Sequence, residues 1–148
     1  MIRIIEPQSD AEWKAYYQLR FDTLRAPWNQ PPGSEKDTME NESIHFFALD
    51  NDIPMGVCRL QYNDEITAQI RFMGVSEKSR GKGIGSLLVK HAEERAKKDH
   101  RSNMILQARD YAVPFYETNG YKIKEKTFLL WEKIQHYLMD KPLCLPPT

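Results

Sequence analysis

A glycine-rich turn between basic residues is the part of the sequence best suited to chemistry. It reads Arg80-Gly81-Lys82-Gly83-Ile84-Gly85. Alternating glycines let a backbone turn tightly and direct successive N–H groups toward one point. Apolar residues at helical spacing follow, so a helix is expected to begin here, and its N-terminus adds partial positive charge. With the full charges of Arg80 and Lys82, the turn is predicted to bind a phosphate group.

Three kinds of glycine-rich phosphate turn compete for this segment. A dinucleotide-binding turn needs G-x-G-x-x-G at the opening of a β-α-β unit, whereas this chain has G-x-G-x-G after predicted hairpins. A P-loop needs G-x-x-x-x-G-K followed by Ser or Thr, and the sequence has no such run. The third candidate is R-x-x-G-x-G, formed by Arg80, Gly83 and Gly85, which is weak evidence when it stands alone.

The elements that position this turn are predicted from hydrophobic periodicity. Ser9 and Glu12 have the spacing of a capping box and mark the start of a helix that must end before Pro27. Strands are predicted at residues 2–5, 44–49, 54–62, 66–75, 104–108, 121–131 and 134–139, and further helices at 84–98 and 112–119. Strands followed by strand–helix–strand–helix–strand favour an α/β fold with a sheet of mixed direction.

The composition fits one soluble domain. The 148 residues are 41% hydrophobic, which is enough for a single core, and the domain is predicted over residues 1–141 with a loose tail at 142–148. Twenty-one basic residues balance twenty-one acidic ones, so no net charge draws the chain to nucleic acid or membrane. Cys58 and Cys144 lack metal-ligand spacing, and no apolar run approaches the roughly 20 residues that span a bilayer. Together with an N-terminus too short and charged for a secretion signal, this favours a cytoplasmic location.

A second motif lies downstream of the glycine turn. It reads Ala112-Val113-Pro114-Phe115-Tyr116-Glu117-Thr118-Asn119-Gly120-Tyr121. Together with R-x-x-G-x-G, in the same order and at the same spacing, it resembles the GNAT-type (Gcn5-related) N-acetyltransferases, whose second motif is usually A-x-x-F-Y-x-x-x-G followed by Phe or Tyr. The segments at 42–45 and 134–139 are similar to the ElaA-like branch of that family. The resemblance covers about residues 2–141.

The resemblance implies a fold and a cofactor. The fold would be a mixed, mostly antiparallel central sheet flanked by helices, with a splayed strand before the glycine-rich pyrophosphate loop. The co-substrate would be acetyl-CoA, with no metal. The pantetheine arm would pair with the backbone of Met73, Gly74 and Val75. The pyrophosphate would be held by the backbone amides of Arg80, Gly81, Lys82, Gly83, Ile84, Gly85 and Ser86.

Tyr116 falls where many members of the family carry a general acid. When an amine attacks the thioester, the departing CoA thiolate needs a proton, and a phenol with a pKa of about 10 can donate one at neutral pH. The alternative is that Tyr116 only packs beside CoA or hydrogen-bonds to its sulfur.

The sequence leaves the identity of the general base open. Some members have a carboxylate where this chain has Gln69, which cannot take a proton. Other candidates are His45, His136, Glu65, Asp110 or a water relay, and an amine that is already partly neutral needs no base. Arg109 stands where many members have a CoA-contacting asparagine; it could meet a carbonyl or phosphate of the cofactor, or face solvent.

The sequence also leaves the identity of the acceptor substrate open. The resemblance places it between the first helix, the loop after that helix and the final strands, where this chain has Arg20, Arg25, Trp28, Pro31-Pro32, Trp131 and His136. The acidic residues of the loop would attract a cationic amine, whereas the two arginines would suit an acidic acceptor. The acidic residues are Glu35, Asp37, Glu40 and Glu42.

The leading hypothesis is acetyl transfer from acetyl-CoA to a primary amine of a small molecule or peptide, by direct attack on the thioester. The alternative, motivated by Gln69, is a CoA-binding sensor or interaction module without catalysis. Nucleic-acid binding through residues 77–101, which hold eight basic and four acidic residues, is disfavoured by the zero net charge of the chain. A homodimer through the terminal strands is a further expectation from the family.

Overall fold

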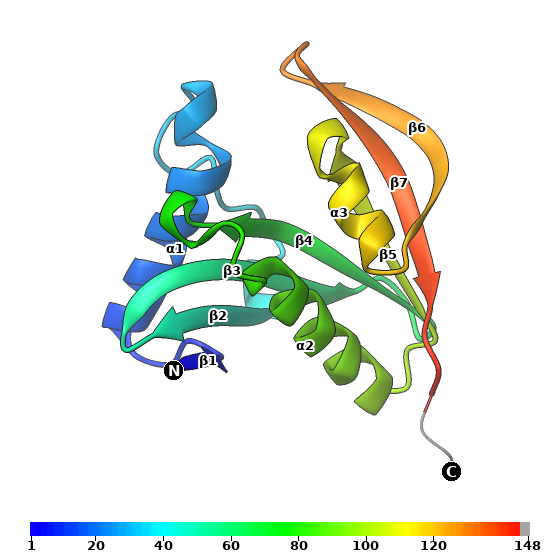
Figure 1. Cartoon of the computed structure of the whole chain (residues 1–148), viewed down its shortest axis with the longest axis horizontal. Coiled ribbons are helices and arrows are strands. Elements are labelled where there is room, and N and C mark those ends of the chain that lie inside the picture. Colours follow the sequence, from blue (N-terminus) through cyan, green and yellow to red (C-terminus); the bar gives the residue numbers. More distant parts are fainter. Residues whose placement is uncertain (146–148) are drawn as a thin grey trace. The chain divides into compact units, whose positions relative to one another are not determined.

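Seven strands form one sheet in the part of the chain that this computed structural model describes, residues 1–145 (Figure 1). Its strand order is β1-β2-β3-β4-β5-β7-β6. The strands are β1 Ile2–Ile5, β2 Ile44–Asp50, β3 Ile53–Tyr62, β4 Thr67–Val75, β5 Asn103–Arg109, β6 Lys122–Leu130 and β7 Ile134–Pro142. The α-helices are α1 Asp10–Leu24, α2 Ile84–Lys98 and α3 Val113–Thr118.

The direction of the strands is mixed. β4 and β5 pair in parallel, whereas β1–β2, β2–β3, β5–β7 and β6–β7 are antiparallel. The predicted α/β fold with a mixed, mostly antiparallel sheet flanked by helices is therefore confirmed. None of the described helices is long and apolar enough to cross a membrane.

Two compact units share these elements. The first unit holds Met1–Gln61 with Phe72–Ala92, and the second holds Tyr62–Arg71 with the chain from Glu93 onward. Each unit is described in turn.

In the first unit, α1 starts at the predicted capping box. The Glu12 N–H donates to Ser9 Oγ (3.1 Å) and the Ser9 N–H donates to Glu12 Oε1 (3.1 Å). One face of α1 then packs on β2 and β3. The core of this contact is made by Tyr16, Leu19, Phe47, Leu49 and Val57. Phe47 and Val57 are direct cross-strand partners, so their side chains share one face of the sheet.

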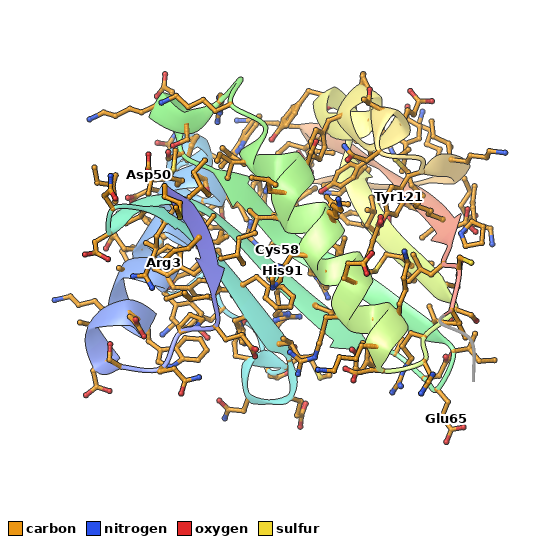
Figure 2. All side chains as sticks on the ribbon, turned by 60° about the horizontal axis from the view of Figure 1, so that its bottom comes forward. Arg3, Asp50, Cys58, Glu65, His91 and Tyr121 are labelled. Atoms are coloured by element: carbon orange, nitrogen blue, oxygen red, sulfur yellow. The ribbon has the colours of Figure 1, made fainter. Side chains whose placement is uncertain are left out.

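The opposite face of β2 and β3 is covered by α2. Phe46 pairs with Cys58, one residue away from the α1-facing pair, and its ring lies 4.9 Å from that of His91 in α2. Figure 2 shows Cys58 and His91 on this α2-covered side. A Cβ at Gly56 would come within 2.9 Å of the side chains of Ile84 and Leu88, so a glycine there lets the helix approach the strand closely. Because successive side chains of a strand alternate, both faces of these strands are buried.

In the second unit, β5 lies between β4 and β7, and β6 and β7 form a hairpin at the edge (Figure 1). A buried polar contact joins the helical and strand layers. Tyr121 donates its hydroxyl to Glu93 Oε2 (2.8 Å), and Lys141 Nζ lies 3.0 Å from Glu93 Oε1. Glu93 is thereby paired as well as hydrogen-bonded, which is the condition for burying a carboxylate.

The last strand extends beyond the predicted 134–139. β7 continues to Pro142, which pairs with Asn103 at the end of its ladder, where a missing N–H removes no interior hydrogen bond. Leu143 is buried, and its N–H donates to Ser102 O (2.8 Å). The first residues of the predicted tail at 142–148 are thus held by β5 and its approach, and residues 146–148 lie outside the described range.

Candidate functional site

The glycine turn lies between β4 and α2 in the first unit, after the short 3₁₀ helix Glu77–Ser79, and it runs into the start of α2. Gly81 and Gly83 have φ of 81° and 78°, the left-handed region that residues with a side chain rarely adopt. Apart from each glycine and its two chain neighbours, no heavy atom of the described residues lies within 4 Å of where a Cβ would stand at either position. The positive φ angles, and not a lack of space for a side chain, therefore favour glycine at these two positions. The predicted order of strand, glycine turn and helix is confirmed.

The start of α2 has the electrostatics of an anion site. The Leu87 N–H donates to Gly83 O (3.1 Å), so the residues just before Leu87 form the first turn of the helix, whose N–H groups point outward along the axis. No acidic residue lies in that first turn. Arg80 and Lys82, both exposed, stand just before it. The turn therefore concentrates positive charge without a competing carboxylate of its own.

The end of β4 changes conformation at Phe72, which has a φ of 53°. The parallel pairing of β4 with β5 covers Thr67–Ile70, so Met73, Gly74 and Val75 follow after that ladder has ended. A Cβ at Gly74 would collide with Thr23 Oγ1 of α1, which makes glycine necessary there. The ladder with β5 therefore ends at Ile70, before the residues at which the resemblance implies a splayed strand.

A buried charge cluster lies against Phe72. The guanidinium carbons of Arg20 and Arg59 are 4.4 and 4.7 Å from its ring centroid, and both arginines are fully buried. Glu40 lies between them, with its Oε2 2.9 Å from Nη1 of each arginine. Asp37 accepts two further bonds from Arg59, at 2.6 and 3.0 Å. The two positive charges of the guanidinium groups are thus balanced by the two negative charges of the carboxylates, and buried charges need such pairing. Arg20 and Glu40, both candidates for recognising the acceptor, are therefore paired with each other.

His45 extends this cluster and is held as a neutral ring. Its Nε2 lies 2.8 Å from Glu40 O, which can only accept, so Nε2 carries the proton. Its Nδ1 then accepts from the hydroxyl of Tyr16 at 2.8 Å. Burial lowers the pKa of His45 below its usual value. Both ring nitrogens are engaged, which weakens the case for His45 as a general base.

Tyr116 belongs to the second unit. It lies on α3, where Pro114 occupies the first turn, and its side chain is buried beside two aromatic rings. The ring of Phe115 is 4.9 Å away and that of Tyr121 is 5.9 Å away, both edge-on. The Tyr121 N–H donates to Tyr116 O (3.0 Å). The ring of Tyr116 is therefore held in place by packing against Phe115 and Tyr121, two other aromatic residues of the motif.

Gln69, which stands at the position of the missing carboxylate, and the candidate bases Glu65 and Asp110 lie in the second unit and are engaged or exposed. Gln69 accepts from Asn63 Nδ2 (2.9 Å), and Asp110 accepts from the Tyr111 N–H (2.7 Å). Glu65 is exposed in the turn between β3 and β4 and projects outward (Figure 2). Glu65 and Asp110 are both exposed, so neither is a carboxylate held in a buried site.

Two further predicted residues lie on paired strands of the second unit. Arg109 and His136 are direct partners across β5 and β7. Arg109 donates to the Tyr111 hydroxyl (3.0 Å), and His136 stacks on Phe128 at 4.2 Å with planes 13° apart. His136 Nδ1 lies 3.1 Å from Ile134 O, so Nδ1 carries the proton. Among the described residues, no group of three or more His, Cys, Asp or Glu is placed to hold a metal ion.

Comparison with known proteins gives concordant matches. The profile of the Acetyltransferase (GNAT) family matches residues 13–121. The uncharacterized N-acetyltransferase YjcF of Bacillus subtilis is 30% identical over 140 residues, which cover 95% of this chain and 99% of that protein.

Two solved structures share the fold. A GNAT family acetyltransferase from Elizabethkingia anophelis, with acetyl-CoA bound, aligns with a TM-score of 0.80 and 18% identity over 96% of this chain and 98% of that one. ElaA of Escherichia coli aligns with a TM-score of 0.79 and 19% identity over 95% and 98%. The ElaA-like branch is therefore not favoured over other branches by the fold.

Proposed function

Because the chain belongs to the acetyltransferase (GNAT) family, we propose that it transfers an acetyl group from acetyl-CoA to a primary amine of a small molecule or peptide. Residues 1–141 would act as one N-acetyltransferase domain. The observation that carries the cofactor assignment is the start of α2, where two left-handed glycines and two exposed basic residues precede a first turn without carboxylates.

The cofactor would be held mainly by backbone groups. The amides of Arg80–Ser86 would bind the pyrophosphate, and the open space beside Gly81 and Gly83 is where its oxygens would lie. The backbone of Met73–Val75, beyond the ladder between β4 and β5, would pair with the amides of the pantetheine arm. Both segments belong to the first unit.

The chemistry needs one proton delivered and one removed. The amine nitrogen bonds to the thioester carbonyl carbon, the carbon–sulfur bond breaks, and Tyr116 gives its phenolic proton to the departing thiolate. The attacking nitrogen loses its proton to water. Gln69 cannot accept that proton and both nitrogens of His45 are engaged, so the acceptor would react as the neutral amine. The rate should then rise with pH as the acceptor deprotonates.

The experiment follows free thiol release from acetyl-CoA with a panel of primary amines, beside calorimetric titration of CoA. Binding and turnover are both expected below about 1 mM cofactor, the upper end of usual Michaelis constants. Absence of both would overturn the proposal. Saturable CoA binding with no thiol release from any amine would instead support a non-catalytic CoA-binding module, the function favoured by the amide at Gln69, which is held by Asn63.

A further inference from the structure

Phe72 of β4 has a backbone conformation that its side chain disfavours. Its φ of 53° lies in the left-handed region, where the Cβ atom comes close to the following carbonyl oxygen. The other described non-glycine residues with positive φ lie outside the strands, whereas Phe72 lies within β4, Thr67–Val75. Because bulky residues are outliers in this region, surrounding contacts must hold Phe72 there.

Two buried cations lie against the ring of Phe72. The guanidinium carbons of Arg20 and Arg59 are 4.4 and 4.7 Å from the ring centroid, and both side chains are fully buried. The Nε atom of each arginine is buried without a hydrogen-bond partner among the described residues. The negative face of the ring therefore supplies an attraction that the missing acceptors do not, and cation–π contacts are strongest where water is excluded.

Both guanidinium groups are also fixed by contacts other than the ring. Arg20 donates from Nη2 to the Tyr16 hydroxyl (3.0 Å) and from Nη1 to Glu35 O (3.1 Å). Arg59 donates from Nη2 to Gln61 Oε1 (2.6 Å), in addition to its bonds with the carboxylates of the charge cluster. Arginines held in this way form a rigid support, because their own rotamers are fixed. The ring thus rests against groups that are already in place.

The segment after Phe72 stays extended and is fixed by neighbouring elements. Residues 73–75 are the last of β4, and its ladder with β5 has ended before them. Gly74 lies against α1, because a Cβ there would collide with Thr23. Just beyond the strand, the Ser76 N–H donates to a carbonyl oxygen of β3 (2.8 Å). An extended backbone that is fixed at both ends can pair with an extended ligand as another strand would.

We propose that Phe72 is a positioning residue for acetyl-CoA, supported by Arg20 and Arg59. The contact between its ring and the two guanidinium groups holds the left-handed φ. That φ sets the direction in which the backbone of Met73–Val75 presents its N–H and C=O groups to the pantetheine arm. Phe72 acts through its backbone and has no part in the chemical step. The inference rests on the proposed function, because it needs the cofactor along this segment.

The test is a calorimetric titration of CoA into the full chain, with three replacements of Phe72. Phe72→Tyr keeps the ring and should keep the dissociation constant of the wild type. Phe72→Leu is apolar but has no aromatic face, so the left-handed φ loses its support and CoA should bind roughly five- to thirtyfold more weakly. Phe72→Gly removes the side chain, but glycine adopts positive φ without strain, so CoA affinity should stay within about threefold of the wild type.

Stability separates this role from simple packing. Urea unfolding should show that Phe72→Gly is less stable than Phe72→Leu, because it loses the whole side chain and gains freedom in the unfolded chain. The order of stability is thus expected to be the reverse of the order of CoA affinity. If affinity instead falls in parallel with stability, the contact is structural only and the proposal is overturned.

Phe47→Leu is the matched control. Phe47 is a buried phenylalanine of β2 in the core under α1, and it belongs to neither of the proposed cofactor segments. Its replacement should lower the stability by loosening the core and should leave CoA affinity unchanged. An equal loss of CoA affinity in Phe47→Leu and Phe72→Leu would show that any loosening of the first unit weakens binding, which would remove the positioning role.

Steady-state kinetics separates positioning from chemistry. Phe72→Leu should raise the Michaelis constant for acetyl-CoA in step with the CoA dissociation constant and change kcat by less than about threefold. A wild type that binds no CoA below about 1 mM would overturn the proposed function and this inference together. Normal turnover in the wild type, with equal CoA affinity in Phe72→Leu, would overturn the positioning role alone and leave the proposed function standing.

Discussion

The guanidinium of Arg20 lies 4.4 Å above the ring of Phe72, at the point where the backbone of β4 turns left-handed. Arg20 comes from α1 and Phe72 from the strand that leads to the glycine turn. Arg59 of β3 lies against the same ring at 4.7 Å. The conformation of this part of β4 is therefore supported by cations from two other elements of the first unit.

Replacing Glu40 by glutamine should destabilise the fold strongly. The change leaves the same shape but removes one of the two carboxylates that balance two fully buried guanidinium groups. Breaking a buried pair on one side costs about 3–5 kcal/mol, so the free energy of unfolding in urea should fall by about that amount. Glu42→Gln, at an exposed position two residues away, should change it by less than about 0.5 kcal/mol. A loss of equal size in both variants would contradict the pairing.

Substituting Gly83 by alanine should weaken CoA binding. A side chain at φ of 78° strains the turn by roughly 1–2 kcal/mol and shifts the amides that would hold the pyrophosphate. Calorimetry should show at least about tenfold weaker CoA affinity. Gly33→Ala is matched in strain, because Gly33 has a φ of 97° and open space around its Cβ position, but it lies in the loop after α1. Unchanged CoA affinity in Gly83→Ala would remove the turn from the cofactor site.

Tyr116→Phe should lower turnover while leaving cofactor affinity nearly intact. The ring and its packing against Tyr121 remain, but the proton for the departing thiolate is lost, and a general acid contributes roughly 10²–10⁴-fold. Steady-state kinetics with a reactive amine gives kcat, and calorimetry gives the CoA dissociation constant. Tyr137→Phe, on β7, serves as the control for loss of a hydroxyl. Equal turnover in Tyr116→Phe and wild type would leave Tyr116 as a packing residue.

Stability should fall as pH drops below about 6.5 because of His45. Burial lowers the pKa of His45 in the folded chain, so the unfolded chain takes up a proton at a higher pH than the folded chain does. Folding is thus favoured above the unfolded pKa, and this contribution is lost as pH falls from there toward the folded pKa. Thermal melts between pH 7.5 and about 5.5 should show the decline, which His45→Gln should flatten. His100→Gln, at an exposed position, should keep it.

The two cysteines should differ in reactivity. Cys58 is fully buried, and burial raises the pKa of its thiol to about 12, whereas Cys144 is exposed. Because the thiolate is the nucleophile, a disulfide reagent at pH 8 should label one thiol rapidly in the native chain and both in urea. The fast phase should disappear in Cys144→Ser. A fast phase that survives this substitution would show that Cys58 is accessible.

Features encoded by short sequence spacing were predictable. The capping box of Ser9 and Glu12 and the turn through Gly81 and Gly83 depend on residues within a few positions of each other, and both form as expected. The charge cluster was not predictable, because Arg20, Glu40 and Arg59 are about twenty residues apart in sequence and meet only through tertiary packing. Periodicity gives α1 as a helix but does not tell a buried arginine from a solvated one.

The charge cluster also limits which chain segments can be exchanged between related proteins. Asp37 and Glu40 stand in the segment between α1 and β2, while their partners Arg20 and Arg59 stand on α1 and β3. A segment transplanted without its arginines, or arginines retained beneath a foreign segment, would carry an uncompensated charge into a dry interior. The acidic residues of the segment between α1 and β2 therefore depend on the arginines of α1 and β3. Chimaeras of this protein should fold only when the segment and these two elements come from the same parent.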